Sequence, residues 1–444
     1  MGIPWVLLDR DVTFVYGEAA VLGGTSEDGG GTSKDGGGTS KEAAVIRRPM
    51  RGLDVEDEIE AMEASLRSMK TDPIVFAPPK ISRLSMVLPT TMEGGVELHG
   101  GVISSTDKAL VLLYAGDYSP GFSGCETSGC HLVFDASSNS LCPIPQLPDS
   151  FRVSGLGRGG VILYRGKGAY VVAELLAKVS GFPDAELYMW VSPNPNCQWI
   201  RKEVCLPPQV FTRSYLFRID TAFSYEESSA CWVDLLQGVV ICNLLREEEP
   251  SFTFVPLPAG YSIDVPNRRR RPRPAEFRSM GCVGGVIKFV ALLGIYEKYP
   301  RSDMFLKTWT LSPDFKEWKE GTTLCIGDLW ASESFLQKGL PQVTPSYPIL
   351  GLHEDEVYIS LNDVDQVDAI DAYDNVYGVR VVPKGHYVLR VDMLQMKIIS
   401  STAGFHIDMA PQMSDMVASE FSAYLKGSKG EEPREPGASR KRKH

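Results

Sequence analysis

The amino-acid sequence predicts an all-β fold built from many short strands. Gly (42) and Pro (30) together supply 72 of the 444 residues, and aromatic residues make up 9%, a composition that suits strands joined by turns. From about residue 74 onwards, short apolar runs alternate with Gly, Pro, Asn and Asp. Similar segments also recur along the chain, so we expect one kind of sheet to be repeated.

The most apolar stretch, ACWVDLLQGVVICNLL at residues 230–245, predicts a β-hairpin. Its one charged residue is Asp234. A continuous helix is disfavoured because Gly238 interrupts the stretch and three β-branched residues, at 239–241, follow directly. Both halves are apolar throughout, so we expect each strand to be covered on both faces.

Internal similarity predicts how these strands are organised. The segments MWVSPNPNCQWIRKEVC (189–205) and TWTLSPDFKEWKEGTTLC (308–325) each have a Trp, a Ser-Pro pair, a second Trp and a Cys, and their first Trp residues are 119 positions apart. Leu-Pro pairs close apolar runs at intervals of 59, 59 and 51 residues. Kelch-type propeller blades have a similar period of roughly 50 residues and cover each other's faces around an axis. We therefore predict a β-propeller-like fold of the kelch type.

The chain divides into six expected regions. The Gly-Thr-Ser heptads lack an apolar position, which indicates a flexible insertion. The segment DVEDEIEAMEASLRSMK has apolar residues at spacings of three and four, which predicts an acidic amphipathic helix. The expected regions are a first strand region of the propeller (1–22), the Gly/Thr/Ser-rich insertion (23–43), the inserted helix (54–70), the propeller-like β domain (74–410), a short C-terminal helix (411–426) and a disordered basic tail (427–444).

Charge and cysteine content narrow the class of protein. The net charge of −11 argues against general nucleic-acid binding. No run approaches the roughly 18 apolar residues of a membrane span, and the start MGIPWVLLDRD has no basic leader, so we expect a soluble chain without a membrane partner. Nine cysteines without a signal peptide indicate reduced thiols, and hence a cytoplasmic or nuclear location.

The hairpin at 230–245 also carries a family resemblance. The chain resembles the plant domain-of-unknown-function family 1618, which is greatly expanded in grasses, at Trp232, Val233, Asp234, Leu235, Gly238 and Cys242. The segments WVLLDRDVTFV, APPKISRL, YVLRVDM and SEFSAYL are also similar to family positions, whereas the family usually has Asp in place of Asn243. The resemblance implies a propeller-like β domain similar to the domains that follow F-boxes in plant ligase adaptors. It implies no catalytic residues.

Two motifs resemble ligand-binding sites, but the neighbouring sequence or the spacing of their residues argues against ligand binding. GLGRGG places Gly155, Gly157 and Gly160 in a dinucleotide-binding pattern, but the strand-forming VILY follows where a helix is needed, so a turn between strands is favoured. Four residues could ligate zinc, namely Cys125, Cys130, His131 and Cys142. Their spacing is not that of a zinc finger, so we expect the cysteines to be buried or loop thiols. We predict no metal and no cofactor.

Acidic residues gather in NDVDQVDAIDAYDN, at Asp363, Asp365, Asp368, Asp371 and Asp374. We expect a solvated acidic loop here, because a calcium-binding loop would need Gly at its sixth position. HEDEV at 353–357 lacks the second His of a zincin, and GFSGC around Ser123 lacks the second Gly of a nucleophile elbow.

Basic residues gather in two places. Arg268 to Arg271 and Arg273 form a Pro-bounded cluster, and the tail carries Arg440, Lys441, Arg442 and Lys443. Such clusters can bind nuclear import receptors or anionic surfaces, and the alternative is a solvated loop and a frayed tail. The tail is the candidate import signal.

The function that these observations favour is a non-catalytic protein-interaction module, because propellers present loops on a rigid ring. The partner is expected to be a protein of unknown identity. The alternative is a propeller-type hydrolase or glycan-acting enzyme with carboxylates in a central channel.

Overall fold

The structure is a computed structural model, and it is mostly β. It describes residues 3–16, 69–88, 100–116, 118–120, 129–148, 153–157, 159–178, 183–194, 198–212, 215–245, 249–265, 271–295, 297–353, 355–370, 376–404 and 415–425. The predicted insertion at 23–43, nearly all of the predicted helix at 54–70 and the basic tail lie outside these residues.

Five consecutive stretches of the chain form antiparallel sheets. The first contains β5 (Gly101–Asp107), β6 (Leu110–Gly116), β7 (Gly129–Asp135) and β8 (Ser140–Ile144). The second contains β9 (Val153–Gly155), β10 (Val161–Gly166), β11 (Ala169–Lys178), β12 (Asp184–Ser192) and β13 (Ile200–Cys205). The third contains β16 (Thr221–Tyr225), β17 (Ser229–Asp234), β18 (Gly238–Asn243) and β19 (Phe252–Pro256).

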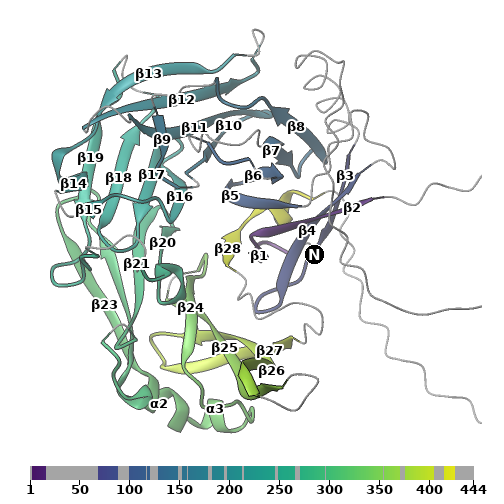
Figure 1. Cartoon of the computed structure of the whole chain (residues 1–444), viewed down its shortest axis with the longest axis vertical. Coiled ribbons are helices and arrows are strands. Elements are labelled where there is room, and N and C mark those ends of the chain that lie inside the picture. Colours follow the sequence, from purple (N-terminus) through teal and green to yellow (C-terminus); the bar gives the residue numbers. More distant parts are fainter. Residues whose placement is uncertain are drawn as a thin grey trace, which may run out of the picture.

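The last two sheets repeat the four-stranded pattern. The fourth contains β20 (Arg278–Val283), β21 (Val286–Leu293), β22 (Phe305–Leu311) and β23 (Trp318–Cys325). The fifth contains β24 (Pro345–Leu350), β25 (Glu356–Ile370), β26 (Val376–Asp392) and β27 (Lys397–Gly404). Consecutive strands pair in each, and the sheets follow one another in chain order around a common centre (Figure 1).

Strands from both ends of the described chain complete this arrangement. They are β1 (Val6–Asp9), β2 (Asp11–Tyr16), β3 (Lys70–Ile74), β4 (Ile81–Leu88) and β28 (Met416–Ser419). β1 pairs antiparallel with β28 and parallel with β4, and β2 pairs with both β4 and β5. The first strand is therefore bonded directly to the last.

Helices and minor elements are short. They are α2 (Ile326–Ala331), α3 (Glu333–Leu336), the 3-10 helices η1 (Pro208–Val210), η3 (Pro274–Glu276), η4 (Arg301–Asp303) and η5 (Phe421–Tyr424), and the strand pair β14 (Phe211–Thr212) and β15 (Tyr215–Leu216). No helix among the described residues is long and apolar enough to cross a membrane.

The hairpin predicted at 230–245 is confirmed as β17 and β18, and both of its faces are covered. Successive side chains of a strand point to opposite faces. Trp232 and Val240 pack on the second sheet with Leu175, whereas Val233 and Val239 pack in a separate cluster with the fourth sheet. A strand between two other sheets has no solvent face, which explains why the stretch is apolar at every position.

Apolar clusters of the same kind join every pair of neighbouring sheets. Leu112 of the first sheet packs with Val172 of the second, and Leu292 of the fourth packs with Ile359 of the fifth. The fifth sheet then packs on the paired terminal strands through a cluster that contains Trp5, Leu7, Ile349, Tyr358, Val388 and Met416. The buried core is thus divided into layers between sheets and has no single centre.

The two Trp-containing segments occupy equivalent places, as their similarity predicts. Trp190 lies on β12 and Trp309 on β22, each the third strand of its four main strands. The second Trp of each copy fixes the preceding sheet. Trp199 Nε1 donates to the Pro145 carbonyl at 2.9 Å, and Trp318 Nε1 donates to the Pro256 carbonyl at 2.8 Å. The repeated Trp is therefore an inter-sheet hydrogen-bond donor.

Two sequence predictions about secondary structure are wrong. In the described part, 415–425, of the C-terminal helix predicted at 411–426, the structure has strand β28 followed by the 3-10 helix η5, because β1 offers a free edge that 416–419 complete. The acidic segment from Asp363 is not a loop up to residue 370, because it continues strand β25 in register with β26. Lys70, the expected end of the inserted helix, is the first residue of β3 and pairs with Val87.

The glycine motif at 155–160 is a close-packed connection between β9 and β10. Gly157 has φ of +140° and forms an isolated parallel bridge with Ile219. A Cβ atom on Gly160 would lie 2.8 Å from Glu174 Oε1 and 2.9 Å from Leu112 Cδ2. These glycines let the backbone pass between three sheets, which agrees with the predicted turn rather than with phosphate binding.

We predict that Gly160→Ala lowers the free energy of unfolding by about 1–3 kcal/mol, because the added methyl group overpacks a filled space. Urea denaturation followed by tryptophan fluorescence measures this. The matched control is Gly281→Ala in strand β20, where a Cβ would meet no atom within 4 Å, and stability should stay within about 0.5 kcal/mol of the parent. Equal midpoints for both variants would contradict the packing argument.

Candidate functional site

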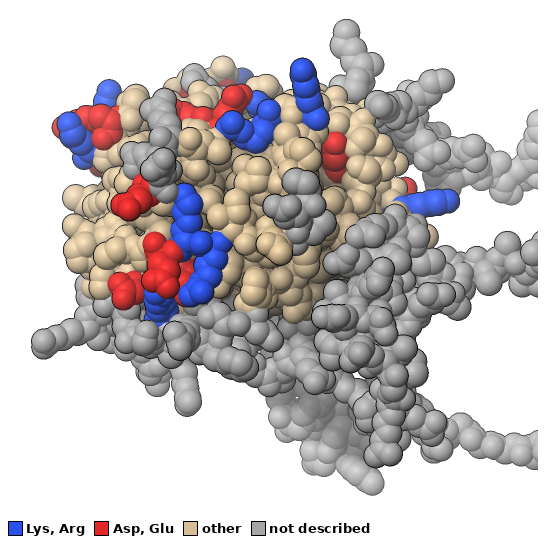
Figure 2. Space-filling model, turned by 90° about the horizontal axis from the view of Figure 1, so that it is seen from above, with Lys and Arg blue, Asp and Glu red and all other residues tan. Residues whose placement is uncertain are grey.

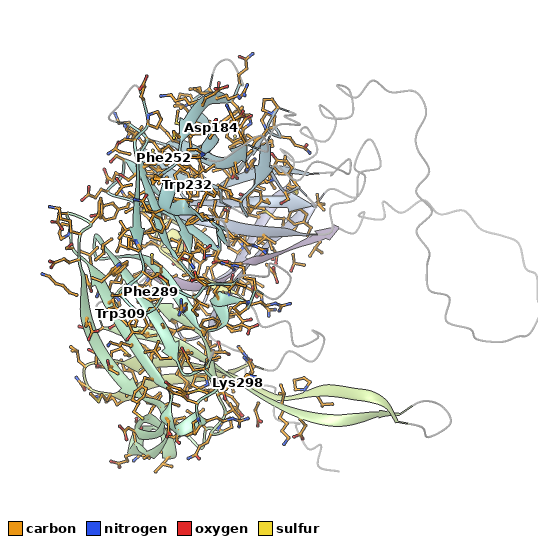
Figure 3. All side chains as sticks on the ribbon, turned by 60° about the vertical axis from the view of Figure 1, so that its left-hand side comes forward. Asp184, Trp232, Phe252, Phe289, Lys298 and Trp309 are labelled. Carbon is orange, nitrogen blue, oxygen red and sulfur yellow. The ribbon has the colours of Figure 1, made fainter. Side chains whose placement is uncertain are left out.

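The six residues that carry the family resemblance are structural. Trp232 is fully buried, and its Nε1 donates to the Gly159 carbonyl at 2.7 Å, across the boundary between the second and third sheets (Figure 3). A Cβ on Gly238 would lie 2.3 Å from the Val255 carbonyl oxygen, so only Gly fits beside β19. Val233, Leu235 and Cys242 are also buried. None of these side chains faces solvent.

Asp234 is the centre of a buried ion-pair network. Its carboxylate accepts from the backbone N–H groups of Arg218 (2.8 Å) and Leu236 (2.9 Å). Arg271 donates to Asp234 at 2.8 Å and, through both terminal nitrogens, to Asp220 at 2.7 Å. Burial raises the pKa of Asp220 to about 6, although the Arg271 guanidinium acts in the opposite direction. The network ties the hairpin to the segment before η3.

This network corrects the sequence interpretation of the arginine cluster. Arg271 is neither a solvated loop residue nor part of an accessible basic patch, because its guanidinium bridges two buried carboxylates. Arg273 is exposed, whereas Arg268 to Arg270 lie outside the described residues. The tail residues Arg440, Lys441, Arg442 and Lys443 also lie outside them.

A second buried polar cluster joins the first and second sheets. Tyr114 Oη donates to Glu174 Oε1, and His131 Nε2 lies 2.9 Å from the same oxygen. The backbone N–H of Gly160 donates to Tyr114 Oη at 2.7 Å. Burial, with the neighbouring Glu174, raises the pKa of Tyr114 well above its usual range. All three side chains are sealed from solvent, so the cluster holds sheets together and offers no entry for a substrate.

The residues considered as zinc ligands do not come together in the structure. Cys130 and His131 are consecutive in β7, so their side chains point to opposite faces of the sheet. Cys142 is exposed on β8, and Cys125 lies outside the described residues. The part of the chain that the structure describes contains no group of three or more His, Cys, Asp or Glu able to hold a metal ion.

Arg10 fills the region where the terminal strands meet the other sheets. Its guanidinium donates to the carbonyls of Ile103 (3.0 Å) and Ser104 (2.8 Å) on β5 and to Thr221 Oγ1 (3.1 Å) on β16. Its Nε lies 3.5 Å from Asp415 Oδ1, just before β28. One side chain therefore connects four segments that are far apart in sequence.

Asp9, next to Arg10, is a carboxyl group with a perturbed pKa. It is 7% exposed, and burial raises its pKa to about 6 despite a hydrogen bond from the backbone N–H of Asp11 at 3.1 Å. Arg83 Nε is 3.9 Å away, too far to compensate fully. Asp9 is therefore a nearly buried carboxyl group whose pKa in the folded protein is about 6.

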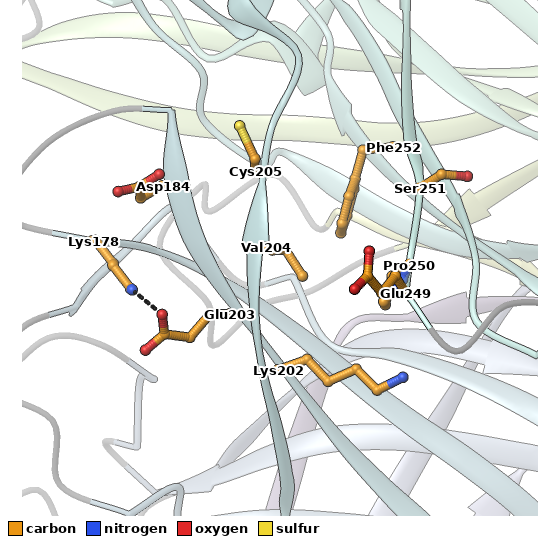
Figure 4. Close-up of a pocket in the computed structure, with 10 residues that line it drawn as sticks. All are labelled: Lys178, Asp184, Lys202, Glu203, Val204, Cys205, Glu249, Pro250, Ser251 and Phe252. Carbon is orange, nitrogen blue, oxygen red and sulfur yellow. Dashed lines mark ion pairs between the residues drawn. The ribbon is translucent and has the colours of Figure 1, made fainter.

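An open groove with a volume of about 690 Å³ lies between the edge strands β13 and β19. Val204 and Phe252 form its apolar floor and pack on the cluster between the second and third sheets (Figure 4). Lys178 and Glu203 form an ion pair of 3.0 Å at one side. The remaining lining residues are Asp184, Lys202, Cys205, Glu249, Pro250 and Ser251.

Charges of both signs surround this part of the molecule. Figure 2 shows Lys and Arg side chains lying beside Asp and Glu side chains on the face seen from above, with uncharged surface between the groups. Among the described residues this face has no broad area of one sign. The groove lining likewise combines two Lys residues with Asp184, Glu203 and Glu249, so it suits a ligand with both polar and apolar groups rather than a polyanion.

A second recess of about 70 Å³ lies between the fourth and fifth sheets. Its lining includes Lys288, Thr308, His353 and Glu356, but sites for organic ligands usually exceed about 300 Å³. His353, the single His of HEDEV, accepts a hydrogen bond from Trp5 Nε1 at 3.3 Å. This recess is too small for a cofactor.

Of the ionisable residues that build these sites, the sequence analysis named Asp234, His131, Arg271 and the His353–Val357 segment, but not Glu174, Asp220, Asp9 or Arg10. A usable signal was present, because Glu174 is the one charged residue within the apolar run of AYVVAELLAK before its terminal Lys178, and Arg10 interrupts LLDRDV. A single charge in a strand buried on both faces must find a buried partner. The identity of the partner follows only from the three-dimensional fold.

Replacement of Arg271 with Ala should lower the free energy of unfolding by about 3–5 kcal/mol, because two carboxylates are left buried without their cation. Chemical denaturation measures the change. Lys316→Ala, which breaks the exposed pair with Asp314 at 3.4 Å, is the control and should cost no more than about 1 kcal/mol. Adding Asp220→Asn to the Arg271→Ala variant should recover part of the loss. A loss no larger than that of the control would contradict the network.

Asp9→Asn should raise the free energy of unfolding at pH 7.5. The folded-state pKa of Asp9 is raised from 3.8 to about 6, so its charged form destabilises the fold above pH 6, by at most about 3 kcal/mol, and this penalty disappears as the pH falls below about 4. Asn keeps an acceptor for the Asp11 N–H. The stability difference between variant and parent should therefore shrink between pH 7.5 and pH 4, as measured by denaturation at each pH. A constant difference would show that Asp9 does not titrate in this range.

Comparisons with known proteins give a limited result. No curated protein matches the chain. Among solved structures, the subtype N10 neuraminidase-like protein of A/little yellow-shouldered bat/Guatemala is 10% identical, with a TM-score of 0.30, covering 68% of this chain and 81% of that one. Sqt1 of Saccharomyces cerevisiae is 11% identical, with a TM-score of 0.29, covering 68% and 74%. Fructan 1-exohydrolase IIa from Cichorium intybus is 12% identical, with a TM-score of 0.27, covering 74% and 60%.

A family profile gives the more specific match, and it covers the fourth sheet entirely and parts of its two neighbours. Residues 232–358, which begin at Trp232 of the buried hairpin, match the family described as "Protein of unknown function (DUF1618)".

Proposed function

We propose that this chain is a protein-interaction module built on a propeller-like β scaffold. The scaffold part of the proposal is supported by the sheets that follow one another around a common centre, with β5, β16, β20 and β24 contacting the next strand of the series. Each sheet is held between two neighbours, so its edge strands are fixed in position. A rigid scaffold with fixed edges suits recognition of a partner.

The groove between β13 and β19 is the observation that carries the proposal. It is open, its floor is apolar at Val204 and Phe252, and its rim is charged at Asp184, Lys202 and Glu249. Both β13 and β19 are the last strands of their sheets, so each presents an edge to this side. An extended peptide can bury apolar side chains on such a floor and pair polar groups with the rim.

The alternative, a propeller-type hydrolase or glycan-acting enzyme, is supported by one group. Asp9 has a pKa of about 6, which is a useful value for a general acid, and it lies beside Arg10 near the centre. Its carboxylate is nearly sealed, however, and it lines neither of the two recesses described above. The interaction module therefore accounts for more of the structure.

The proposal extends to cellular context. It places the chain in the cytoplasm or nucleus, where reduced thiols such as those of Cys231 and Cys242 persist. The resemblance to F-box-associated domains makes recruitment of a partner to a plant ligase one form of the proposal.

Selection of random linear peptides on the full chain tests the proposed function. Peptides that bind the groove should lose at least tenfold in affinity for Ser251→Arg, because the new side chain occupies an exposed position in the groove. Thr253→Arg, an exposed position two residues further along the chain that does not line the groove, is the matched control and should change affinity less than twofold. Equal binding to both variants, or failure to select any peptide, would count against the groove as the binding site.

A further inference from the structure

Strands β25 and β26 continue well beyond their sheet. β24 pairs with β25 only as far as Leu361, and β27 pairs with β26 only from His386. From Asp363, paired with Gly385, to Ile370, paired with Val376, the two strands form an antiparallel ribbon bonded to no other described strand. Eight residues of strand at about 3.3 Å each give the ribbon a length of about 26 Å. Figure 3 shows it leaving the body of the molecule.

A two-stranded ribbon of this length is incomplete as a sheet. An isolated hairpin is at best marginally stable in water, and a third strand gives the hydrogen bonds and burial that it lacks. Both outer edges of the ribbon carry backbone N–H and C=O groups that no described strand satisfies. Such an edge is a template for another extended chain.

The two edges are not equivalent. The projecting part of β26 contains Pro383, which has no N–H to donate, and pairing is irregular beside it, between Asp363 and Val364. The projecting part of β25, from Asn362 to Ile370, contains neither Pro nor Gly. The β25 edge is therefore the one that can pair along its whole length.

Charge defines what can pair with this edge. The β25 segment carries Asp363, Asp365 and Asp368 and no Lys or Arg, in a chain whose net charge is −11. Asp365 and Lys384 form a cross-strand ion pair of 2.8 Å whose side chains are about half exposed, so the acid remains accessible to a further cation. Opposite charges on adjacent strands stabilise their pairing, and like charges destabilise it. Two copies of β25 would bring two acidic segments together, which disfavours a second copy of this chain.

We propose that the outer edge of β25, from Asn362 to Ile370, binds an extended basic segment of a partner protein by β-strand addition. The added strand forms main-chain hydrogen bonds to β25 and places Lys or Arg next to Asp363 and Asp365, which lie on one face of the strand. This surface belongs to the fifth sheet and is separate from the groove between β13 and β19, so either site can fail its test without the other.

The test uses the full chain and a short fluorescent peptide of alternating Lys and Val, with binding measured by anisotropy. Two control peptides are an alternating Glu and Val peptide and the Lys-Val peptide N-methylated at every second residue, which keeps the charge but removes hydrogen-bond donors. We expect only the unmodified Lys-Val peptide to bind. Equal binding of the N-methylated peptide would show charge attraction without strand addition and would overturn the proposal.

Two protein variants locate the site. In one, Asn362 is joined to His386 by Asn-Gly, a turn suited to a two-residue hairpin loop, which removes the ribbon but keeps the sheet pairs. In the other, Asp363, Asp365 and Asp368 are all replaced with Asn. We expect at least tenfold weaker binding for the first and at least fivefold for the second. The matched control replaces the exposed Asp303, Asp314 and Asp328 with Asn and should change affinity less than twofold. Unchanged binding to the ribbon-free variant would overturn the proposal.

Two further measurements distinguish other occupants of the edge. Sedimentation should give the mass of one chain, and a dimer that disappears in the ribbon-free variant would show that a second copy occupies the edge. A chain lacking residues 427–444 should bind the Lys-Val peptide with unchanged affinity. Tighter binding after this truncation would show that the basic tail of the same chain occupies the edge. Either outcome would overturn the proposal.

Discussion

Mutual burial of neighbouring sheets is the interaction on which this structure depends. A four-stranded sheet with apolar residues on both faces is unstable alone, because burial of apolar surface at about 25 cal/mol per Å² is what offsets the entropy of ordering its strands. The hairpin around Trp232 shows the consequence. One face is covered by the second sheet and the other by the fourth, so the third sheet cannot keep its shape if either neighbour is lost.

Polar groups at the sheet boundaries add specificity to this packing. Apolar faces can slide over one another at small cost, whereas the contacts between Arg271 and Asp234 and between His131 and Glu174 form in one arrangement only. A buried polar group without its partner is costly, so these contacts penalise the wrong arrangement. The indole hydrogen bonds of Trp199, Trp232 and Trp318 act in the same way at three different boundaries, since each donor finds one carbonyl of a neighbouring sheet.

Much of the fold could be predicted from local patterns. The apolar hairpin, the repeated Trp segments and the all-β character follow from strand periodicity and turn residues, which are properties of short stretches of sequence. The prediction of a helix at 411–426 was wrong because residues 416–419 pair with β1. This pairing is a long-range interaction that local propensity cannot reveal. The groove was missed for a related reason, since Val204 and Phe252 meet only when two sheets pack. The acidic segment that begins at Asp363 was predicted to be a loop because acidic residues have low strand propensity. The Val residues between the acidic residues, however, favour a strand.

Pairing between β1 and β28 has a consequence for biosynthesis. During synthesis residues 6–9 leave the ribosome long before their antiparallel partner at 416–419. Until then the apolar strand Val6–Asp9 lacks one neighbour and presents an open edge to other nascent chains. Contacts of such large sequence separation also slow the last step of folding. The topology therefore leaves the edge of this strand open to mispairing until residues 416–419 are available.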